Sequence, residues 1–373
     1  MNKPCIYPHP LDYAAGIKYC LTALKAKTSY IINPSSFYVE EVVDWAKLGF
    51  SKDRGQYVVL KLEKKGIDTL SAISKMERLY GLPHDNLVFL GLKDRDATAV
   101  QYLFVRKELL KPSKVENEAL TDKLHVRVIG YCRRRPRRKH LLGNRFRVIV
   151  NLNNNNDLYI VKRILRLVVE HGLPSYYGYQ RFGIKRSNSH LLGKYTLLGR
   201  LDLLSFELLH GVYPYEAKPS IIGRLAHYFF PAMSYERRYL AERDLGKAIS
   251  RLKRETHSIL ISAYAAYLYN LLLNKVIERK GWNGLKERYP GIGCQEAYER
   301  FYREILEIES VLPAKLLGFR CWYREGAFKP LNISLHHDNG KIIIEFTLKR
   351  GFYATIVLRE IFKDSLKFNV DTM

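Results

Sequence analysis

Patterns typical of β-strands occupy both ends of this chain, and a long helical stretch separates them. Near the start, residues 57–63 have the β-branched, apolar composition of a strand. From about 184 to 315 the apolar residues recur at helical spacing. Strand patterns return at 331–335 and 341–346, with the hairpin signal Asp338-Asn339-Gly340 between them. We therefore expect an α+β fold in which the last strands rejoin the first sheet and the helical block is an insertion.

Each part contains further predicted elements. Strands are also expected at 87–90, 101–105, 125–129 and 146–150. One helix is expected from a cap at Asp68 or Thr69 to Tyr80, with Gly81 ending it. Further helices are expected over 158–171, 258–278, 295–310 and 354–363. We place the first part of the sheet body at 1–174, the insertion at 175–325 and the last part of the body at 326–373.

The chain carries a large excess of positive charge. Its 373 residues include 62 Lys and Arg against 37 Asp and Glu, a net charge of +25. Such an excess indicates a polyanionic partner, with nucleic acid favoured over a membrane surface. No uninterrupted apolar stretch reaches the ~18 residues of a membrane-spanning helix. The first residues lack the charged-then-apolar pattern of a signal peptide, so a cytoplasmic location is expected.

Cysteine and histidine give no pattern of a metal site. Five cysteines lie at positions 5, 20, 132, 294 and 321. Their number is odd, they are widely scattered and none forms a CxxC pair, so neither a zinc site nor a disulfide framework is expected. No HxxxH pair occurs among the 11 histidines, and no protein-bound metal is expected.

The densest run of charge extends from Arg133 to Lys139, between two predicted strands. We expect an exposed loop there, with phosphate-binding candidates Arg133, Arg134, Arg137 and Arg138. A solvated tip that binds nothing is the alternative interpretation, and a nuclear address is a further one.

Asp94 lies in the segment Gly91-Leu92-Lys93-Asp94-Arg95, directly after the predicted strand 87–90. Lys93 and Arg95 would keep it ionised, because nearby cations lower the pKa of a carboxylate. An ionised, positioned carboxylate can act as a nucleophile or a base. Taken alone, the segment is better interpreted as a charged turn with a local ion pair, since such turns are far commoner than active sites.

Aromatic and basic residues alternate between Tyr176 and Gly183. Aromatic faces stack on unpaired bases, and Gln180 and Arg181 could contact phosphates or base edges. A tyrosine-rich structural corner explains the same residues at least as well.

In this order, the segments resemble those of the TruD family of tRNA pseudouridine synthases. The matching motifs are Asn33-Pro34-Ser35-Ser36-Phe37-Tyr38-Val39-Glu40-Glu41, Gly91-Leu92-Lys93-Asp94-Arg95 with Gln101, Gly143-Asn144-Arg145-Phe146, Pro174-Ser175-Tyr176-Tyr177-Gly178-Tyr179-Gln180-Arg181-Phe182-Gly183, Ser262-Ala263-Tyr264 with Tyr267-Leu268-Tyr269-Asn270, and Gly351-Phe352-Tyr353-Ala354-Thr355 with Arg359-Glu360. They extend over residues 30 to 363, nearly the whole chain.

The resemblance implies a pseudouridine synthase catalytic domain with a mixed, largely antiparallel sheet, interrupted by a mostly helical TRUD insertion. It implies that tRNA is the substrate, with a D-arm uridine as the target, and that no cofactor or metal takes part. Asp94 would be the catalytic group, Phe146 would stack on the flipped uracil, and Asn144 would orient it or support the loop. The alternative for Phe146 is an inward-facing residue at the start of the strand 146–150. Lys93, Arg95, Gln180 and Arg181 would join the basic loop in holding RNA.

The chain departs from the family pattern at Ile31, where a lysine is frequent, and at Ser35, Ser36 and Ser175. Two alternatives stay open, and the departure at Ile31 motivates the first. One is a tRNA-binding protein of the same fold with weak activity or activity at another site, such as an anticodon-loop uridine. The other is an aspartate-dependent nuclease, which needs clustered carboxylates for Mg²⁺. Oligomeric state has no signature in the sequence.

Overall fold

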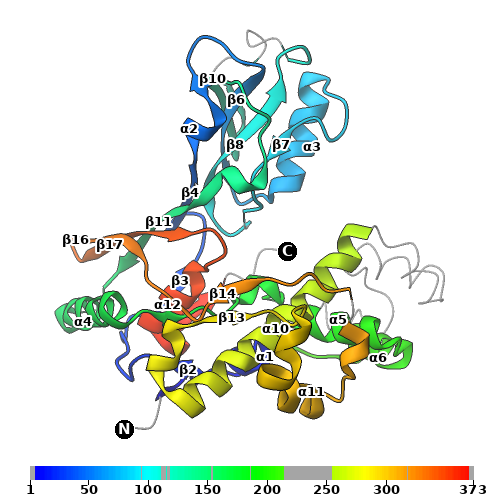
Figure 1. The fold of residues 1–373 in the computed structure, drawn as a ribbon. Coiled ribbons are helices and arrows are strands. Elements are labelled where there is room, and N and C mark those ends of the chain that lie inside the picture. Colours follow the sequence, from blue (N-terminus) through cyan, green and yellow to red (C-terminus); the bar gives the residue numbers. More distant parts are fainter. Residues whose placement is uncertain are drawn as a thin grey trace.

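A computed structural model describes residues 5–93, 95–110, 115, 118–152, 154–184, 186–213, 254–316 and 318–368. Its central feature is a ten-stranded sheet in the order β16-β17-β11-β4-β8-β6-β10-β5, with β7 paired to β8 and β9 to β10 (Figure 1). The strands are β4 (Phe37–Val43), β5 (Phe50–Ser51), β6 (Tyr57–Lys65), β7 (Val88–Phe89), β8 (Thr98–Arg106), β9 (Glu118–Thr121), β10 (Leu124–Cys132), β11 (Leu141–Asn151), β16 (Leu331–Asp338) and β17 (Lys341–Lys349). Only β4 and β8 run parallel within this sheet, so the expected mixed, largely antiparallel sheet is confirmed.

The last two strands rejoin the first sheet, as the sequence predicts. β17 pairs with β11 along its length, and Phe346 lies opposite Phe146 in the register. The connecting hairpin turns at Asn339 and Gly340, whose φ angles of 46° and 74° are left-handed. Asn and Gly are the residues that such a turn favours. Segments separated by about 190 residues therefore form one continuous sheet (Figure 1).

One end of the sheet forms an upper lobe with helix α3 (Thr69–Tyr80) on one face and the short helix α2 (Trp45–Leu48) on the other (Figure 1). The Asp68 side chain caps α3 by accepting from the Ser71 N–H, and Gly81 ends the helix at a φ of 64°. Both caps agree with the sequence prediction. The helix contributes Ala72, Ile73 and Met76 to a core shared with β6, β8 and β10.

The other elements surround a larger core in the lower part of the molecule (Figure 1). The helices are α1 (Pro10–Ala14), α4 (Asn155–His171), α5 (Ser189–Leu198), α6 (Leu201–His210), α10 (Arg254–Lys280), α11 (Arg303–Glu309) and α12 (Ala354–Phe362). Four small two-stranded sheets join β1 (Cys5–Ile6) to β2 (Tyr19–Cys20), β3 (Tyr30–Ile32) to β18 (Leu366–Phe368), β12 (Leu173–Pro174) to β15 (Ala327–Phe328) and β13 (Arg288–Pro290) to β14 (Tyr323–Glu325).

The stretch expected to be helical is mostly helical where the structure describes it, through α5, α6, α10 and α11. The single helix expected over 295–310 is instead a 3₁₀ turn, a π-helical turn and then the short α11. The side chains of Asn270 and Asn274 on α10 donate to the carbonyls of Ala15 and Gly16. The first residues of the chain thus pack on the helical block. The proposed domain limits at 174 and 325 stay a prediction.

Helix α10 is the one described helix that is long and apolar enough, over Ser258–Lys280, to cross a membrane by length and composition. However, 67% of its apolar window is buried inside the protein. Tyr264, Leu268 and Leu273 are among its fully buried side chains. Burial of this kind is typical of a core helix.

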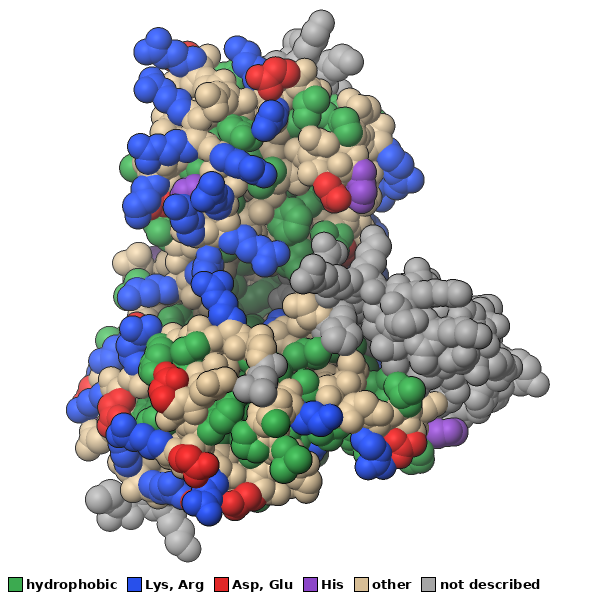
Figure 2. Space-filling model, turned by 45° about the vertical axis from the view of Figure 1, so that its right-hand side comes forward, with side chains coloured by type: hydrophobic (Ala, Val, Ile, Leu, Met, Phe, Trp, Pro, Cys, Tyr) green, Lys and Arg blue, Asp and Glu red, His purple; other side chains and the backbone are tan. Residues whose placement is uncertain are grey.

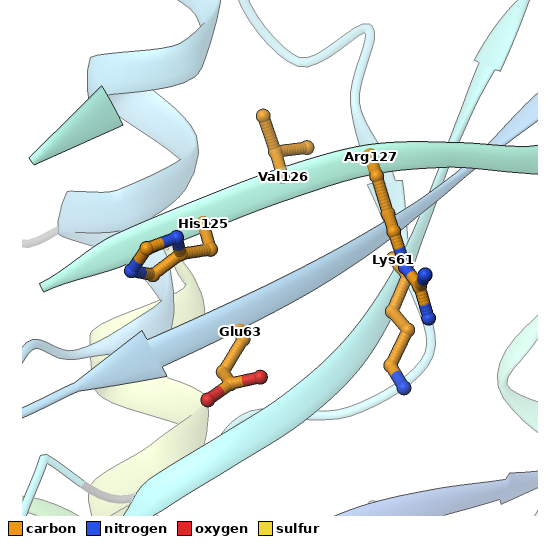
Figure 3. A pocket seen from close by; sticks show the side chains of 5 residues that line it. All are labelled: Lys61, Glu63, His125, Val126 and Arg127. Atoms are coloured by element: carbon orange, nitrogen blue, oxygen red, sulfur yellow. The ribbon is translucent and has the colours of Figure 1, made fainter. Parts of the chain in front are cut away.

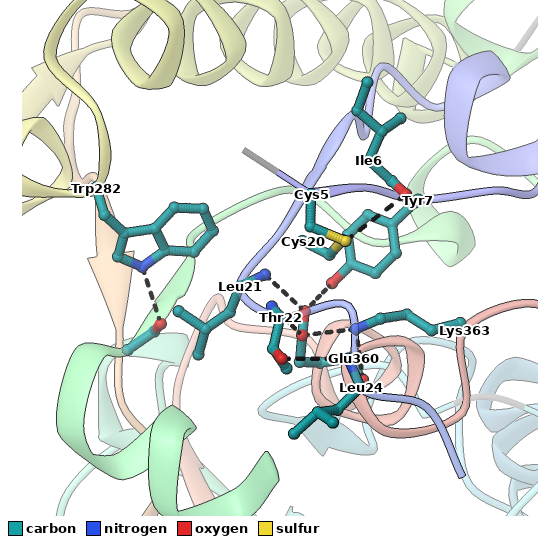
Figure 4. Close-up of polar contacts among 11 residues, drawn as sticks. Cys5, Ile6, Tyr7, Cys20, Leu21, Thr22, Leu24, Trp282, Glu360 and Lys363 are labelled. Carbon is teal, nitrogen blue, oxygen red and sulfur yellow. Dashed lines mark hydrogen bonds and ion pairs between the residues drawn. A yellow bond between two sulfur atoms is a disulfide. The ribbon is translucent and has the colours of Figure 1, made fainter. Parts of the chain in front are cut away.

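The expectation that disulfides are absent is wrong. Cys5 is bonded to Cys20 and Cys294 to Cys321, while Cys132 is free and buried. Cys5 and Cys20 are register partners in the β1–β2 pair (Figure 4). The partners are 15 and 27 residues apart in sequence, and folding brings them together. Spacing alone could not indicate these pairs.

Candidate active site

Asp94 lies outside the described residues, so the site is defined by the residues on either side of it. The segment Gly91–Lys93 follows β7 and Leu90, and Arg95 begins the return into β8. Arg95 is exposed, and its contact with RNA stays a prediction.

Three hydrogen bonds anchor the backbone that leads to Asp94. The Gln101 side chain on β8 donates to the Gly91 carbonyl over 2.8 Å. Thr69, the first residue of α3, donates through its hydroxyl to Gln101 Oε1 over 2.8 Å. The same hydroxyl accepts from the Lys93 N–H over 2.9 Å. Strand β8 and the start of α3 thus hold the segment in place. The two side chains that do so, Gln101 and Thr69, are buried.

The Lys93 side chain points into the protein and pairs with a carboxylate. Its Nζ lies 2.7 Å from Glu41 Oε1, and the two side chains are only 5% and 0% exposed. The other carboxylate oxygen of Glu41 accepts from the Tyr102 N–H over 3.0 Å. The sequence predicted Lys93 as an RNA contact and a charge partner of Asp94. The structure pairs its charge with Glu41, while the influence on Asp94 and the contact with RNA stay predictions.

Asn144 is the register partner of Glu41 across the β4–β11 pair, and directly opposed residues point to the same face of a sheet. Its Oδ1 atom is buried and has no hydrogen-bond partner among the described residues. The preceding Gly143 allows β17 to approach closely, because a Cβ there would lie 2.1 Å from the Leu348 carbonyl oxygen. The Gly-Asn pair therefore places one unsatisfied acceptor beside the Glu41–Lys93 pair.

Phe146 lies two residues further along β11 on the same face. It is 7% exposed, and its ring lies between those of Phe37 and Phe346, with centroid distances of 5.9 Å and 5.3 Å. This is the environment of a core residue. Stacking on a substrate base, the role expected from the family motif, stays untested.

Ile31 on β3 is 46% exposed, which is unusual for an isoleucine in a strand. Its register partner on β18 is Lys367, whose side chain is exposed. An exposed basic residue thus lies beside the position where the family often has a lysine.

The basic loop is exposed, as the sequence predicts: Arg133, Arg134, Arg137 and Arg138 all lie at the surface. Its backbone is well anchored. The N–H groups of Arg133 and Arg134 donate to the Leu48 carbonyl at the end of α2. Arg350, after β17, donates to the Arg138 carbonyl over 2.7 Å.

His140 follows this loop and accepts a hydrogen bond from its backbone. It is buried, and its Nδ1 accepts from the Arg137 N–H over 3.0 Å. Burial lowers the pKa of His140, and the nearby charge of Lys139 lowers it further. The neutral imidazole therefore acts as an internal support for the loop.

Figure 2 shows Lys and Arg side chains spread over the upper lobe and continuing towards the hollow between it and the lower part of the molecule.

Gln180 and Arg181 connect the sheet body to the helical block. Gln180 Oε1 accepts from the Thr355 hydroxyl on α12 over 3.1 Å. Arg181 donates through Nη2 to the Ser262 hydroxyl on α10. Both residues are half-buried and therefore partly accessible. Their contact with RNA stays a prediction. The neighbouring Tyr176 and Tyr179 are fully buried, as the structural-corner interpretation predicts.

A buried polar network is centred on Glu360 of α12, and no pattern in the sequence indicated a role for it. Glu360 accepts from the Tyr7 hydroxyl over 2.6 Å and from the Leu21 and Thr22 N–H groups over 3.1 Å, and it pairs with Lys363 over 2.6 Å (Figure 4). The network connects the N-terminal segment to α12.

Next to it, Arg359 Nε lies 3.1 Å from Asp12 Oδ1, with both side chains fully buried. Burial raises the pKa of Asp12, while Arg359 and the Tyr179 hydroxyl act in the opposite direction. Arg359 and Glu360 lie in a family-like motif, but the sequence does not show which distant residues they contact.

Two other groups of polar residues lie outside this site. Among the residues that the structure describes, one group could present metal-ligating atoms, namely Cys294, Glu296 and Cys321, but its two sulfurs are bonded to each other. An open pocket of about 300 Å³ lies on the sheet face away from α3 and is lined by Lys61, Glu63, His125, Val126 and Arg127 (Figure 3). Its charges are mixed, and no catalytic arrangement is evident.

Comparison with known proteins places the chain. The family model of tRNA pseudouridine synthase D (TruD) matches residues 16–291. The "Probable tRNA pseudouridine synthase D" of Pyrococcus abyssi is 32% identical, over 89% of this chain and 95% of its own length. The tRNA pseudouridine synthase D of Aquifex aeolicus is 24% identical, over 90% of this chain and 98% of its own length.

The solved structure of the "Putative tRNA pseudouridine synthase D (TruD)" from Methanosarcina mazei has the same fold. It superposes with a TM-score of 0.69 over 96% of this chain and 99% of that chain, at 19% sequence identity. Because the family model covers most of the sequence and curated relatives match along nearly their full length, the chain belongs to the tRNA pseudouridine synthase D (TruD) family.

Proposed function

We propose that this chain converts one particular uridine of tRNA into pseudouridine and that Asp94 is its catalytic group. Family membership supports the reaction class, an isomerisation by a pseudouridine synthase. The observation that carries the assignment of Asp94 is the anchoring of the segment before it. Gln101 and Thr69 fix the backbone of Gly91 and Lys93, which is what a positioned catalytic group requires.

The reaction moves the uracil from one ring atom to another. The bond between N1 and C1′ of the nucleoside breaks, a bond between C5 and C1′ forms, and the hydrogen on C5 is released to water while N1 gains one. Nothing is oxidised or hydrolysed. Asp94 either attacks C1′ or removes a ribose proton, and an ionised carboxylate can do both. The target base must first leave its stack, at a cost of a few kcal/mol.

Asn144 is the candidate for holding the flipped uracil. Its Oδ1 is buried and unpaired, and if the side chain turned outwards it could accept from a base N–H, a bond that would satisfy an otherwise costly group. Phe146, buried between two aromatic rings, would mainly fix the strand that carries Asn144. Any stacking on uracil would use the 7% of its surface that is exposed.

The basic loop would bind the phosphate backbone of tRNA. Lys47 lies beside it, 71% exposed, and Arg350 is bonded to it, so the loop is the centre of a larger basic patch. Arg350 also donates its N–H to the Leu142 carbonyl, two residues before Asn144. The patch and the proposed base site therefore meet on one strand. A D-arm uridine is the target that the family resemblance implies.

A second candidate is a tRNA-binding protein of the same fold that modifies a different uridine, for example in the anticodon loop. The exposed Ile31 favours it, because this position often carries a lysine in the family.

Mapping pseudouridine in tRNA from cells with and without this chain separates the two. We expect one D-arm pseudouridine to disappear and to return when the purified protein acts on unmodified tRNA. Loss of an anticodon-loop pseudouridine would support the second candidate. An unchanged tRNA map, together with an inactive purified protein, would contradict both.

A further inference from the structure

Glu41 is a buried carboxylate that the proposed reaction does not use. It lies on β4, is 3% exposed and binds both Lys93 Nζ and the Tyr102 N–H. The adjacent Glu40 points to the opposite face, where it accepts from the Tyr102 hydroxyl over 3.0 Å. The two consecutive glutamates thus have different environments, and it is Glu41 that contacts the segment before Asp94.

Stability alone does not explain such a pair. Removing two charges from water is costly, and replacing a buried ion pair by uncharged side chains is often neutral or stabilising. Breaking one partner is costly, because the other charge is left uncompensated. The buried ion pair is therefore better explained by the orientation that it gives to Lys93 than by a gain in folding free energy.

The pair completes a three-sided hold on the segment Gly91–Lys93. Glu41 on β4 holds the Lys93 side chain, Thr69 on α3 holds its N–H, and Gln101 on β8 holds the Gly91 carbonyl. Gly91 itself has little room, since a Cβ there would lie 3.0 Å from Leu141 and 3.4 Å from Lys93 Nζ. Glu41, Thr69 and Gln101 thus hold the segment from three different secondary-structure elements.

We propose that Glu41 and Lys93 are positioning residues: their buried ion pair fixes the direction in which the chain emerges at Asp94. Neither residue touches the reacting atoms in this account. The inference rests on the proposed function, in which Asp94 is catalytic. Misplacing a catalytic group by about 1 Å can lower a rate by ~10²-fold, so a loosened segment should show in turnover even when the fold is intact.

The test compares four variants with the wild type: Glu41→Gln, Lys93→Met, the double variant carrying both, and Glu40→Gln as the matched control. In the double variant no buried charge is left unpaired, and the introduced amide oxygen can still accept from the Tyr102 N–H. Three quantities are measured for each: melting temperature, Kd for unmodified tRNA, and tritium release at saturating 5-³H-uridine tRNA.

We expect both single variants to melt lower than the wild type and the double variant to recover most of that loss. Turnover of the double variant should stay reduced by ~10²-fold, with Kd within about twofold of the wild type. The Glu40→Gln control should turn over normally. A double variant that recovers turnover together with its melting temperature would overturn the positioning role and leave the pair as packing.

Hydrogen exchange tests the positioning role of Glu41 and Lys93 without relying on the enzymatic reaction. Peptides that cover residues 91–96 should exchange faster in the double variant than in the wild type, while peptides from β6 and β10 exchange at the same rate. Equal exchange of residues 91–96 in both proteins would overturn the inference. Failure of the proposed function would look different, because either the wild type would form no pseudouridine or Asp94→Asn would release tritium at the wild-type rate.

Discussion

The ring of Phe146 on β11 stacks against the ring of Phe346 on β17, with centroids 5.3 Å apart and planes inclined by 27°. The two residues are register partners, although 200 residues separate them in the chain. Phe37 on β4 lies on the other side of Phe146. This aromatic row joins the first and last parts of the sheet just below the proposed base site.

Phe146→Ala should therefore destabilise the fold. Truncating a buried phenylalanine costs about 3–5 kcal/mol of unfolding free energy, so the melting temperature should fall by several degrees. Phe146→Leu fills most of the volume without an aromatic face and serves as the comparison. We expect the leucine variant to keep turnover within a few-fold of the wild type when assayed below its melting temperature. Steep loss of turnover in a leucine variant that melts normally would instead establish stacking on the substrate.

Replacing Arg133, Arg134, Arg137 and Arg138 with alanine should weaken tRNA binding and flatten its salt dependence. Each phosphate contact that is lost removes roughly 0.7–0.9 from the slope of log K against log salt, because fewer counterions are released on binding. Turnover at saturating tRNA should change little. The measurement is Kd by gel shift at several salt concentrations.

The matched control for the basic loop is on α4, at the other end of β11, where Lys162, Arg163 and Arg166 are exposed. Their replacement by alanine should change the slope less per charge removed. If both sets of substitutions change the slope equally, the loop has no special role and the tRNA senses only net charge.

His190 on α5 should make the fold sensitive to acid. It stacks on Tyr267 and is buried, and burial lowers its pKa to about 3. Because this value is below the unfolded-state value of 6.5, the unfolded chain takes up a proton that the folded protein excludes. The histidine's contribution is therefore fully present above pH 6.5 and is lost as pH falls towards 3.

Melting temperatures of the wild type and of His190→Phe, measured from pH 7 to pH 5, test this. Below pH 6.5 the wild type should lose up to roughly 1.4 kcal/mol per pH unit more than the variant, which cannot titrate at this position. Parallel curves would show that the site accepts a proton without penalty.

The sequence indicated those elements whose signals are local. Asp68 and Gly81 cap α3 because a short polar acceptor and a left-handed glycine satisfy the ends of a helix wherever it packs. The Asn339-Gly340 turn likewise determined the final hairpin. Exposure of the basic loop followed from charge repulsion, since that many cations cannot be buried together.

Pairings between distant residues could not be predicted in this way. Glu41 and Lys93 are 52 residues apart and meet only because β4 lies beside β8. The Cys294–Cys321 bond depends on the same kind of long-range arrangement. The buried environment of Phe146 agrees with the alternative that the strand pattern offered, because Phe146 shares the inward alternation of Val148 and Val150.

The most direct test of the proposed function is Asp94→Asn. Tritium release from 5-³H-uridine tRNA is measured for the variant and the wild type, with tRNA binding by gel shift on the same preparations. The substitution keeps the size of the side chain but removes the nucleophile or base. We predict no detectable release by the variant and a Kd for tRNA close to that of the wild type. Release at the wild-type rate would contradict the assignment of Asp94 as the catalytic group.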